Sequence, residues 1–203
     1  MTQMKKCIHK YEKQGRAIIN ALKDRGALEG WYRTLSDLYP DNAHFVFELL
    51  QNSEDANATK VEFKLSDNSL IFLHNGTRAF SEDDINSITN IGNSNKSINK
   101  IGKFGVGFKS VFTYTDTPKI HSKNISFQIQ NLIVPSLIDG EEIDYGYTTL
   151  FEFPFNRKNK DKEIACKEIS NLFNELSDNV LLFLDSVSEI IWNLEDGSRF
   201  SIL

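Results

Sequence analysis

The sequence predicts one soluble domain built from both helices and strands. Its 203 residues are enough for one large domain, or for one domain with an appendage. Apolar residues make up 40% of the chain and charged residues 25%, which is ordinary for a globular protein, and fifteen Phe supply bulk for a core. Segments with helical spacing of apolar residues occur together with short runs typical of strands. A largely disordered chain is therefore excluded.

Composition argues against several functional classes. The net charge of −5 argues against a free-standing nucleic-acid-binding domain, which is normally basic. The sequence has two cysteines, Cys7 and Cys166, so neither a disulfide framework nor a cysteine-rich zinc site is expected. It has no apolar run of membrane-spanning length, and residues 1–10 lack the apolar core of a signal peptide. We therefore expect no membrane association and a reducing, cytoplasmic location.

The first part of the chain is predicted to be helical. Apolar residues recur at spacings of three and four over residues 5–39, with breaks near Gly26 and Gly30. A proline and two short acceptor side chains then predict the start of a second helix, over residues 42–56.

Short strands and further helices are predicted after residue 56. Ser81, followed by three acidic residues, predicts the capped start of a helix that runs towards Thr89. Residues 92–103 are small and polar and predict a mobile loop or lid, and residues 102–115 predict a glycine-rich loop that leads into a helix. The predicted strands are residues 60–65, 70–74, 125–129 and 149–153, with one around Ile120; a helix is predicted over 160–178, and a final hairpin joins 187–192 to 199–203 around Asp196 and Gly197.

A stripe of polar residues is predicted on one face of the helix over residues 42–56. Glu48, Asn52 and Asp55 are spaced four and three residues apart, so they share one side of a helix. An Asn side chain offers a neutral oxygen to magnesium, and a Glu one turn away can orient or deprotonate a water molecule. A solvated polar face explains the same stripe, and the segment alone does not decide between the two.

A glycine-rich segment is the second candidate. Gly102, Gly105 and Gly107 leave the backbone free to approach a ligand, and backbone N–H groups at a helix start bind phosphate. The spacing matches neither the dinucleotide-binding fingerprint nor the P-loop. An ordinary tight loop accounts for the glycines as well.

Two further segments place polar groups at strand ends. Asn75 and Gly76 follow a predicted strand, where they form either a turn or a place for base recognition. Thr148 and Thr149 precede another strand and would offer hydroxyl groups to a ligand, although Thr is also favoured in strands without any ligand. Neither segment alone decides the function.

Together, the order and spacing of these segments resemble the ATP-binding module of the GHKL superfamily, which includes gyrase B, ninety-kilodalton heat-shock chaperones, histidine kinases and MutL. Residues 48–56 look like the N box of that superfamily. Residues 101–110, Ile-Gly-Lys-Phe-Gly-Val-Gly-Phe-Lys-Ser, are very similar to the phosphate-binding glycine box of the chaperones. The likeness covers roughly residues 38–155. The segments most similar to the sacsin-type branch are residues 39–52, 74–84 and 91–94.

The resemblance implies the Bergerat ATP-binding fold, an α+β two-layer sandwich in which a mixed, mostly antiparallel sheet is covered on one face by helices. Residues 41–203 would form this domain, and residues 1–40 would form a helical segment packed on it. Because the sequence stops in or just after the last predicted strand, we expect the domain to be excised from a longer protein.

The resemblance also implies roles for individual residues. Glu48 would be the general base that activates water against the γ-phosphate, and Asn52 would hold the magnesium ion. Asp55 would support the polar network of that helix, and residues 92–103 would be the ATP lid. The remaining ATP-binding candidates are Ala56, His74, Asn75, Gly76, Ser94, Lys96, Gly102, Lys103, Phe104, Gly105, Val106, Gly107, Phe108 and Thr149, and four lysines, Lys96, Lys100, Lys103 and Lys109, are expected near the phosphates.

One position departs from the superfamily pattern. The superfamily usually has Asp where this chain has His74, and the second glycine of that motif is missing. A neutral nitrogen of His74, or the amide oxygen of Asn75, could accept the hydrogen bond from the adenine amino group. Thr149, or Thr148 one register away, would join the adenine network. Either substitute for Asp would alter how strictly adenine is selected.

The implied function is that of a Mg-dependent ATPase domain whose nucleotide state drives conformational change or dimerisation in a larger chaperone-like or remodelling protein. Its partners would be ATP or ADP, other domains of the longer chain, and a second copy in a nucleotide-dependent homodimer. Turnover would be weak in isolation, because relatives often need a residue from a following domain. The alternatives are a nucleotide-binding regulatory or protein-interaction module without hydrolysis, and the ATPase module of a DNA-related or defence assembly. A kinase-like phosphotransferase is disfavoured, because no His phosphoacceptor segment is evident.

Overall fold

One eight-stranded sheet organises the molecule. The computed structural model describes residues 2–31, 33, 44–90, 107–123, 125–176 and 178–203. The strands are β1 (Lys60–Leu65), β2 (Ser69–His74), β3 (Lys119–Ser122), β4 (Ile125–Gln130), β5 (Val134–Leu137), β6 (Thr149–Pro154), β7 (Glu189–Asn193) and β8 (Arg199–Ile202). They lie in the order β5-β4-β3-β6-β2-β1-β7-β8, and every neighbouring pair is antiparallel except β1 and β7.

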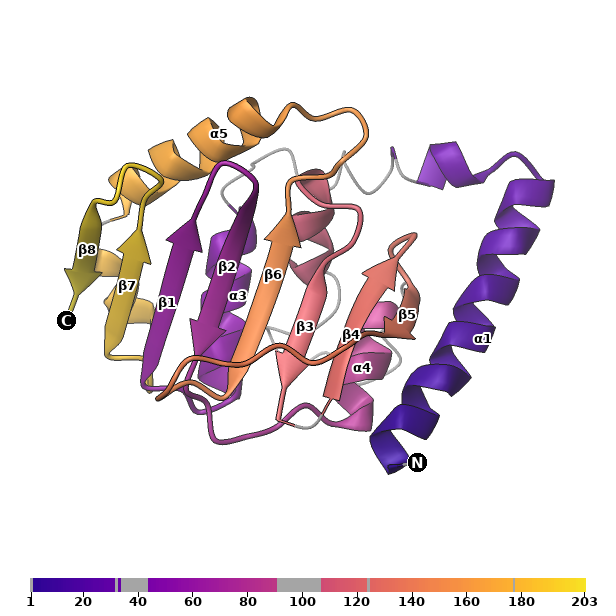
Figure 1. Cartoon of the computed structure of the whole chain (residues 1–203), viewed down its shortest axis with the longest axis horizontal. Helices are drawn as coiled ribbons and strands as arrows, with labels where there is room; N and C mark the ends of the chain where they lie inside the picture. The colour runs from indigo at the N-terminus through magenta and orange to yellow at the C-terminus, as the bar shows by residue number, and fades with distance from the viewer. Residues whose placement is uncertain (1, 32, 34–43, 91–106, 124, 177) are drawn as a thin grey trace.

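Helices pack on one face of this sheet (Figure 1). The helices in the described part of the chain include α1 (Gln3–Asp24), α3 (His44–Asp55), α4 (Glu82–Thr89) and α5 (Lys162–Glu175), with the 3-10 helices η1 (Gly107–Thr113) and η2 (Asp178–Phe183). Ring contacts of Phe108 with Phe151 and of Phe173 with Phe63 place η1 and α5 on the same face. The predicted α+β two-layer sandwich with a mixed, mostly antiparallel sheet is confirmed.

A row of large side chains crosses the helix-covered face of the sheet. Directly paired residues share a face, and the pairing aligns Phe63 with Phe72, Phe72 with Phe151, and Phe151 with Ile120. The ring of Phe108 from η1 packs 6.2 Å from Phe151, between centroids. Phe173 from α5 lies 5.1 Å from Phe63 by the same measure. All of these residues are buried, and this row is the centre of the core.

Helix α1 covers the β5 edge of the sheet (Figure 1). Its buried Gly15 lies against the backbone just before β5, and an added Cβ would be 2.8 Å from the carbonyl oxygen of Ile133. The helix stops where Gly26 adopts a φ of +64°, a conformation that favours glycine. No helix in the described part of the chain has both the length and the apolar character needed to cross a membrane.

The opposite face of the sheet carries charged residues of β1 and is crossed by the segment of residues 138–148 between β5 and β6 (Figure 1). This crossing segment is fixed by side chains of β1. The hydroxyl of Tyr147 donates to Glu62 at 2.7 Å, and Lys64 pairs with Asp144. These contacts tie the crossing segment to the face of the sheet that the helices leave uncovered.

Most predicted elements are present with small shifts in their ends. β1 spans the predicted residues 60–65, and α4 begins at Glu82 with Ser81 as its predicted N-cap, in a capping box in which Ser81 and Asp84 bond to each other's backbone N–H. The final hairpin turns at Gly197, which has a φ of +84°. Residues 42 and 43, at the predicted start of the second helix, lie outside the described part.

Two predictions about local structure were wrong. Residues 28–31 are helical, so the chain is not broken at Gly30. Strand β5 was not predicted because it contains Pro135, which cannot donate to a ladder; the strand is tolerated because it is the outermost one.

Candidate functional site

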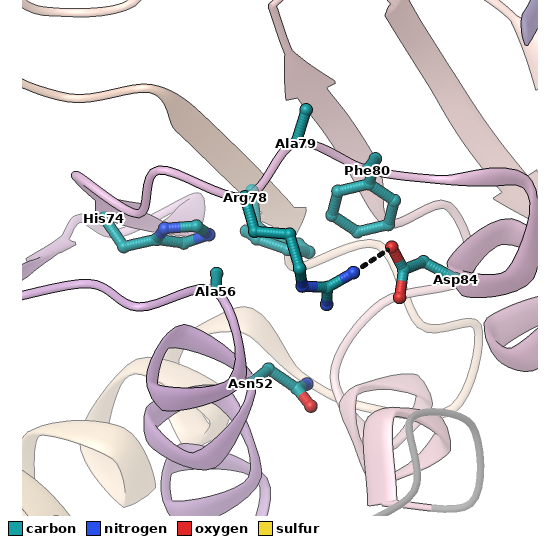
Figure 2. Close-up of a pocket in the computed structure, with 8 residues that line it drawn as sticks. Asn52, Ala56, His74, Arg78, Ala79, Phe80 and Asp84 are labelled. Atoms are coloured by element: carbon teal, nitrogen blue, oxygen red, sulfur yellow. Dashed lines mark hydrogen bonds and ion pairs between the residues drawn. The ribbon is translucent and has the colours of Figure 1, made fainter. Parts of the chain in front are cut away.

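A small pocket lies where the end of α3 meets the end of β2 and the turn that follows it. Figure 2 shows these side chains converging from α3, from β2 with its following turn, and from the start of α4. Its lining residues are Asn52, Ala56, His74, Arg78, Ala79, Phe80, Asp84 and Phe151. Three of these, Asn52, Ala56 and His74, are among the residues that the sequence singled out.

Asn52 is the polar group of α3 that opens into this pocket. The residue is 5% exposed, and its Nδ2 has no hydrogen-bond partner among the described residues. A buried amide normally finds a partner, so an open position of this kind suits a ligand atom. Asp55, on the same predicted stripe, is exposed and does not line the pocket, but its carbonyl oxygen accepts from Nε of Arg78 at 3.0 Å.

The carboxylate of Glu48 lies directly against Gly107. A Cβ added to Gly107 would be 1.8 Å from Oε2 of Glu48, a distance at which two atoms cannot coexist. Helix α3 and η1 pack together at this point, one turn of helix from Asn52. The fold therefore brings the candidate base into contact with the last glycine of the candidate phosphate loop, and a side chain at position 107 would displace the Glu48 carboxylate.

Gly76 allows the turn after β2 to lie close to the end of α3. A Cβ there would be 2.7 Å from the Cβ of Ala56 and 2.8 Å from Nδ1 of His74. The backbone N–H of Arg78 donates to the carbonyl of Ala56, which joins this turn to the end of α3. Small residues at positions 56 and 76 are therefore required for α3 and β2 to meet.

His74 lies on the helix-covered face, at the last position of β2, and is 3% exposed. Figure 2 shows its imidazole directed towards Ala56 and Arg78. Burial, with a further contribution from the Arg78 guanidinium, lowers the pKa of His74 to about 4, so the ring is neutral at pH 7. Its Nδ1 accepts a hydrogen bond from the backbone N–H of Gly76 at 3.1 Å.

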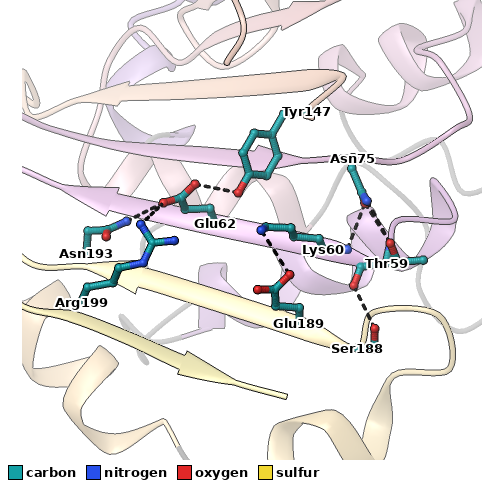
Figure 3. A network of polar contacts seen from close by, with 9 residues as sticks. All are labelled: Thr59, Lys60, Glu62, Asn75, Tyr147, Ser188, Glu189, Asn193 and Arg199. Carbon is teal, nitrogen blue, oxygen red and sulfur yellow. Dashed lines mark hydrogen bonds and ion pairs between the residues drawn. The ribbon is translucent and has the colours of Figure 1, made fainter. Parts of the chain in front are cut away.

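Asn75 faces away from this pocket. Its Oδ1 accepts from the backbone N–H groups of Thr59 and Lys60 at 2.9 and 3.0 Å, and its Nδ2 donates to the Thr59 hydroxyl (Figure 3). These bonds fasten the end of β2 to the start of β1. The expectation that the amide oxygen of Asn75 accepts a bond from a base is therefore wrong, because that oxygen is already engaged.

Thr148, just before β6, and Thr149, its first residue, make different contacts near the end of β2. The Thr148 hydroxyl donates to the carbonyl of Gly76 at 2.6 Å, so it holds the turn after β2. Thr149 is buried opposite His74 in the ladder, and its hydroxyl lies 3.0 Å from that of Ser122. Neither is a lining residue, but both fix the backbone that carries His74.

Arg78 is one of the five lining residues that the sequence did not single out as site candidates. Its guanidinium donates to Oδ2 of Asp84 at 2.7 Å (Figure 2), and this oxygen also accepts from the backbone N–H of Ser81. Phe80 lies beside it, with its ring 5.9 Å from that of Phe151. The signal available in the sequence was an Arg two residues after an Asn-Gly turn, which by itself is typical of a solvated loop.

Of the four lysines expected near the phosphates, Lys109 lies in the described part of the chain. Lys109 does not face the pocket: it is 6% exposed, and its Nζ donates to the carbonyl oxygens of Ile88 and Leu132. The expectation for Lys109 is therefore wrong, because its ammonium group satisfies buried backbone carbonyls. Phe108 is buried in the core. The predicted ligand-binding residues that lie outside the described part are Ser94, Lys96, Lys100, Gly102, Lys103, Phe104, Gly105 and Val106.

The described residues also define what a cation could find here. They contain no group of three or more His, Cys, Asp or Glu side chains arranged to hold a metal. Magnesium bound with nucleotides commonly takes one or two protein ligands and completes its shell with phosphate oxygens and water. On α3, Asn52 lines the pocket and Glu48 lies against Gly107, and both carry oxygen atoms suited to magnesium.

Comparison with known proteins adds independent information. The model of the Sacsin domain family matches residues 64–133. Protein NO VEIN from Arabidopsis thaliana is 28% identical over 191 residues, an alignment that covers 80% of this chain and 7% of that protein. Sacsin from Homo sapiens is 34% identical over 111 residues, which covers 45% of this chain and 2% of sacsin. The chain therefore spans a small part of the length of either relative.

Proposed function

Because this chain contains a sacsin-type domain, we propose that it is a nucleotide-binding module that binds ATP with Mg²⁺ and hydrolyses it slowly. In the longer protein, the bound nucleotide would set the conformation of the domain and its association with other domains or with a second copy. The whole-protein role would be chaperone-like remodelling.

The contact between Glu48 and Gly107 is the observation that supports this proposal most. It joins two segments that are far apart in the sequence and that carry the candidate base and the candidate phosphate loop. Gly107 presents bare backbone beside a carboxylate, and backbone without a side chain is what a phosphate needs for close approach. A side chain at position 107 would push the Glu48 carboxylate out of this contact.

The residues present also fit a magnesium nucleotide. Asn52 would hold the cation through its amide oxygen, and its open Nδ2 remains available to the nucleotide. When bound, the cation would offset phosphate charge. Ala56 and Phe80, which line the pocket, would contact the base, and Gly76 would hold the turn beside them.

Glu48 would act on the water molecule that attacks the phosphate. It is half-buried on α3, where it can accept a proton from water while remaining accessible. Asn52 lies one turn further along the same helix, so base and cation-binding group are held on one rigid element. The buried Leu49 and Leu50 on the same helix anchor this arrangement to the core.

Calorimetry with ATP and ADP in the presence of Mg²⁺ tests binding. We expect the wild type to bind ATP and the Asn52→Ala variant to lose at least tenfold in affinity, because the buried amide has no other partner. Gln51→Ala is the matched control, since Gln51 is exposed on the same helix and should leave the affinity unchanged. Absence of nucleotide binding in the wild type would overturn the proposal.

Phosphate release tests the catalytic role of Glu48. Glu48→Gln keeps the size of the side chain but removes its basicity, so we expect ATP binding to survive and slow turnover to fall at least a hundredfold. Turnover that persists in this variant would contradict the role given to Glu48. Tight ATP binding without turnover in the wild-type full-length protein would instead favour a regulatory nucleotide-binding module.

A further inference from the structure

Glu54 lies in the last turn of α3, and its carboxylate binds a distant part of the chain. Its Oε1 accepts from the backbone N–H groups of Asp185 and Ser186, at 3.2 and 2.5 Å, and its Oε2 accepts from that of Val187 at 3.0 Å. The three donors are consecutive residues of the η2–β7 loop (residues 184–188). One side chain of the helix that carries the candidate site therefore binds three successive amides that follow it by 131 to 133 residues.

A carboxylate at this position needs such partners. The carbonyl groups at the C-terminal end of a helix disfavour a negative charge nearby. The last turn of α3 contains no basic residue that would offset the charge of Glu54. Burial by itself would raise the pKa of Glu54, but hydrogen bonds from the backbone of Val187 and from Ser186 lower that pKa below its usual value. The η2–β7 loop thus stabilises a charge that the helix alone disfavours.

The η2–β7 loop is itself fixed to the fold. Val187 is 3% exposed and belongs to the hydrophobic core. The next residue, Ser188, donates from its backbone N–H to the carbonyl oxygen of Thr59 at 3.0 Å, and its hydroxyl donates to the same oxygen at 3.3 Å (Figure 3). Thr59 is the residue before β1. Glu54 is therefore held by a loop that is anchored both in the core and at the start of a central strand.

Asn52 projects from the other side of the same turn of α3. Residues two apart on a helix lie about 160° apart around its axis, so Asn52 and Glu54 point in nearly opposite directions. On the pocket side, the carbonyl of Ala56 accepts from the N–H of Arg78 at 3.1 Å, and that of Asp55 accepts from its Nε at 3.0 Å. The end of α3 is therefore fastened on two sides. Loss of the Glu54 contacts would let it tilt or rotate, which moves the Asn52 amide.

Building on the proposed nucleotide site, we infer that Glu54 is a positioning residue, which holds the end of α3 against the η2–β7 loop so that Asn52 faces the nucleotide, and which couples nucleotide binding to that loop. The coupling follows from linkage, which is reciprocal. If the Glu54 contacts raise the affinity for ATP by a given factor, bound ATP strengthens these contacts by the same factor. The η2–β7 loop thereby responds to the occupancy of the pocket, although none of its residues lines it.

Calorimetry of ATP binding with Mg²⁺ tests the positioning role. We expect Glu54→Ala to bind ATP more weakly than wild type by about fivefold or more. Glu54→Gln should lose less, because its amide oxygen can keep the two bonds that Oε1 makes. Charge alone predicts the opposite sign, since removing a carboxylate favours the binding of an anion. Gly15→Ala, in the contact of α1 with the backbone before β5, controls for lost stability and should bind ATP within about twofold of wild type.

The outcomes separate this inference from the proposed function. ATP binding by folded Glu54→Ala that is as tight as that of wild type would overturn the inference and leave the proposed function intact. An equal loss of affinity in Gly15→Ala would also overturn it, because the effect would then follow stability and not the position of α3. Absence of ATP binding by the wild type would overturn the proposed function, and hydrogen exchange then decides the role of Glu54.

Amide hydrogen exchange provides a test that needs no nucleotide. In Glu54→Ala, exchange should be about tenfold faster or more at Val187, which loses its acceptor, and at Ala56, which donates to the Asn52 carbonyl at 3.2 Å. Both are measured relative to Phe127 in β4, which reports the general stability. Unchanged relative exchange at Ala56 would overturn the inference whatever the ATP affinities. Bound ATP should slow relative exchange at Val187 in the wild type and not in Glu54→Ala, and the absence of this slowing would contradict the coupling.

Discussion

Lys109 is a lysine whose side chain is used entirely inside the protein. Its Nζ donates to the carbonyl of Ile88 near the end of α4 and, at 2.6 Å, to that of Leu132 in the turn before β5. Burial lowers the pKa of Lys109 to about 7. The residue therefore links a helix to a strand turn, and its state of protonation affects stability.

This pKa predicts a pH dependence of stability. An unfolded lysine titrates near ~10.4, so between about pH 7 and that value the unfolded chain binds more protons than the folded one. The free energy of unfolding attributable to Lys109 should thus rise with pH, by at most about 1.4 kcal/mol per pH unit. Urea titrations at pH 7, 8 and 9 give the free energy of unfolding of wild type and of Lys109→Met. The wild-type value minus the Lys109→Met value should increase with pH. A constant difference would contradict the lowered pKa.

At the scale of elements, Gly15 lets α1 lie close to β5. Glycine in the middle of a helix costs ~1 kcal/mol relative to Ala, so its presence needs a packing reason. The reason is the approach of the strand backbone, because a Cβ at this position would be 2.8 Å from the Ile133 carbonyl oxygen and 3.2 Å from the Cα of Val134. Helix α1 also contacts α4, so its position affects the helix-covered face.

Adding one methyl group at Gly15 should separate α1 from the sheet. We expect Gly15→Ala to lower the free energy of unfolding by about 1–3 kcal/mol, as for an overpacked site. Gly30→Ala is the matched control, because Gly30 is helical and a Cβ there meets nothing within 4 Å. It should be neutral or stabilising by up to ~1 kcal/mol. Equal effects of the two substitutions in chemical denaturation would show that α1 does not depend on this contact.

At the scale of the molecule, the crossing segment of residues 138–148 links the face of the sheet opposite the helices to the candidate site. Tyr147 bonds to Glu62, which is 5% exposed and also accepts from Asn193 at 2.8 Å (Figure 3). The next residue, Thr148, donates from its backbone N–H to the His74 carbonyl at 3.0 Å and from its hydroxyl to Gly76. The position of His74 therefore depends on contacts on both faces.

Removing the Tyr147 hydroxyl should loosen this link. We expect Tyr147→Phe to lower the free energy of unfolding by about 1–2 kcal/mol, since a buried carboxylate loses a donor. Amide hydrogen exchange at Thr148 should also become faster. Tyr145→Phe, at a fully exposed position, should change neither quantity. Unaltered exchange at Thr148 in Tyr147→Phe would indicate that the crossing segment and the site are independent.

The sequence predicted the elements where local signals suffice. The capping box at Ser81, the strand over residues 60–65 and the Gly197 hairpin depend on neighbours within a few residues, and all three are present. It missed β5, because a proline in a strand is acceptable only at an edge, and edge position is set by the whole sheet.

Within the candidate site, the sequence by itself determined which residue types occur and in what order, including Glu48, Asn52 and the glycines at 76 and 107. Only the tertiary structure decided which side chains converge: it placed Glu48 against Gly107, directed His74 into the pocket and Asn75 away from it, brought in Arg78 and buried Lys109 elsewhere. The physical reason is that the orientation and the protonation state of a side chain depend on its hydrogen-bond partners. For Asn75 and Lys109 these partners are distant in the sequence, and no local pattern specifies them.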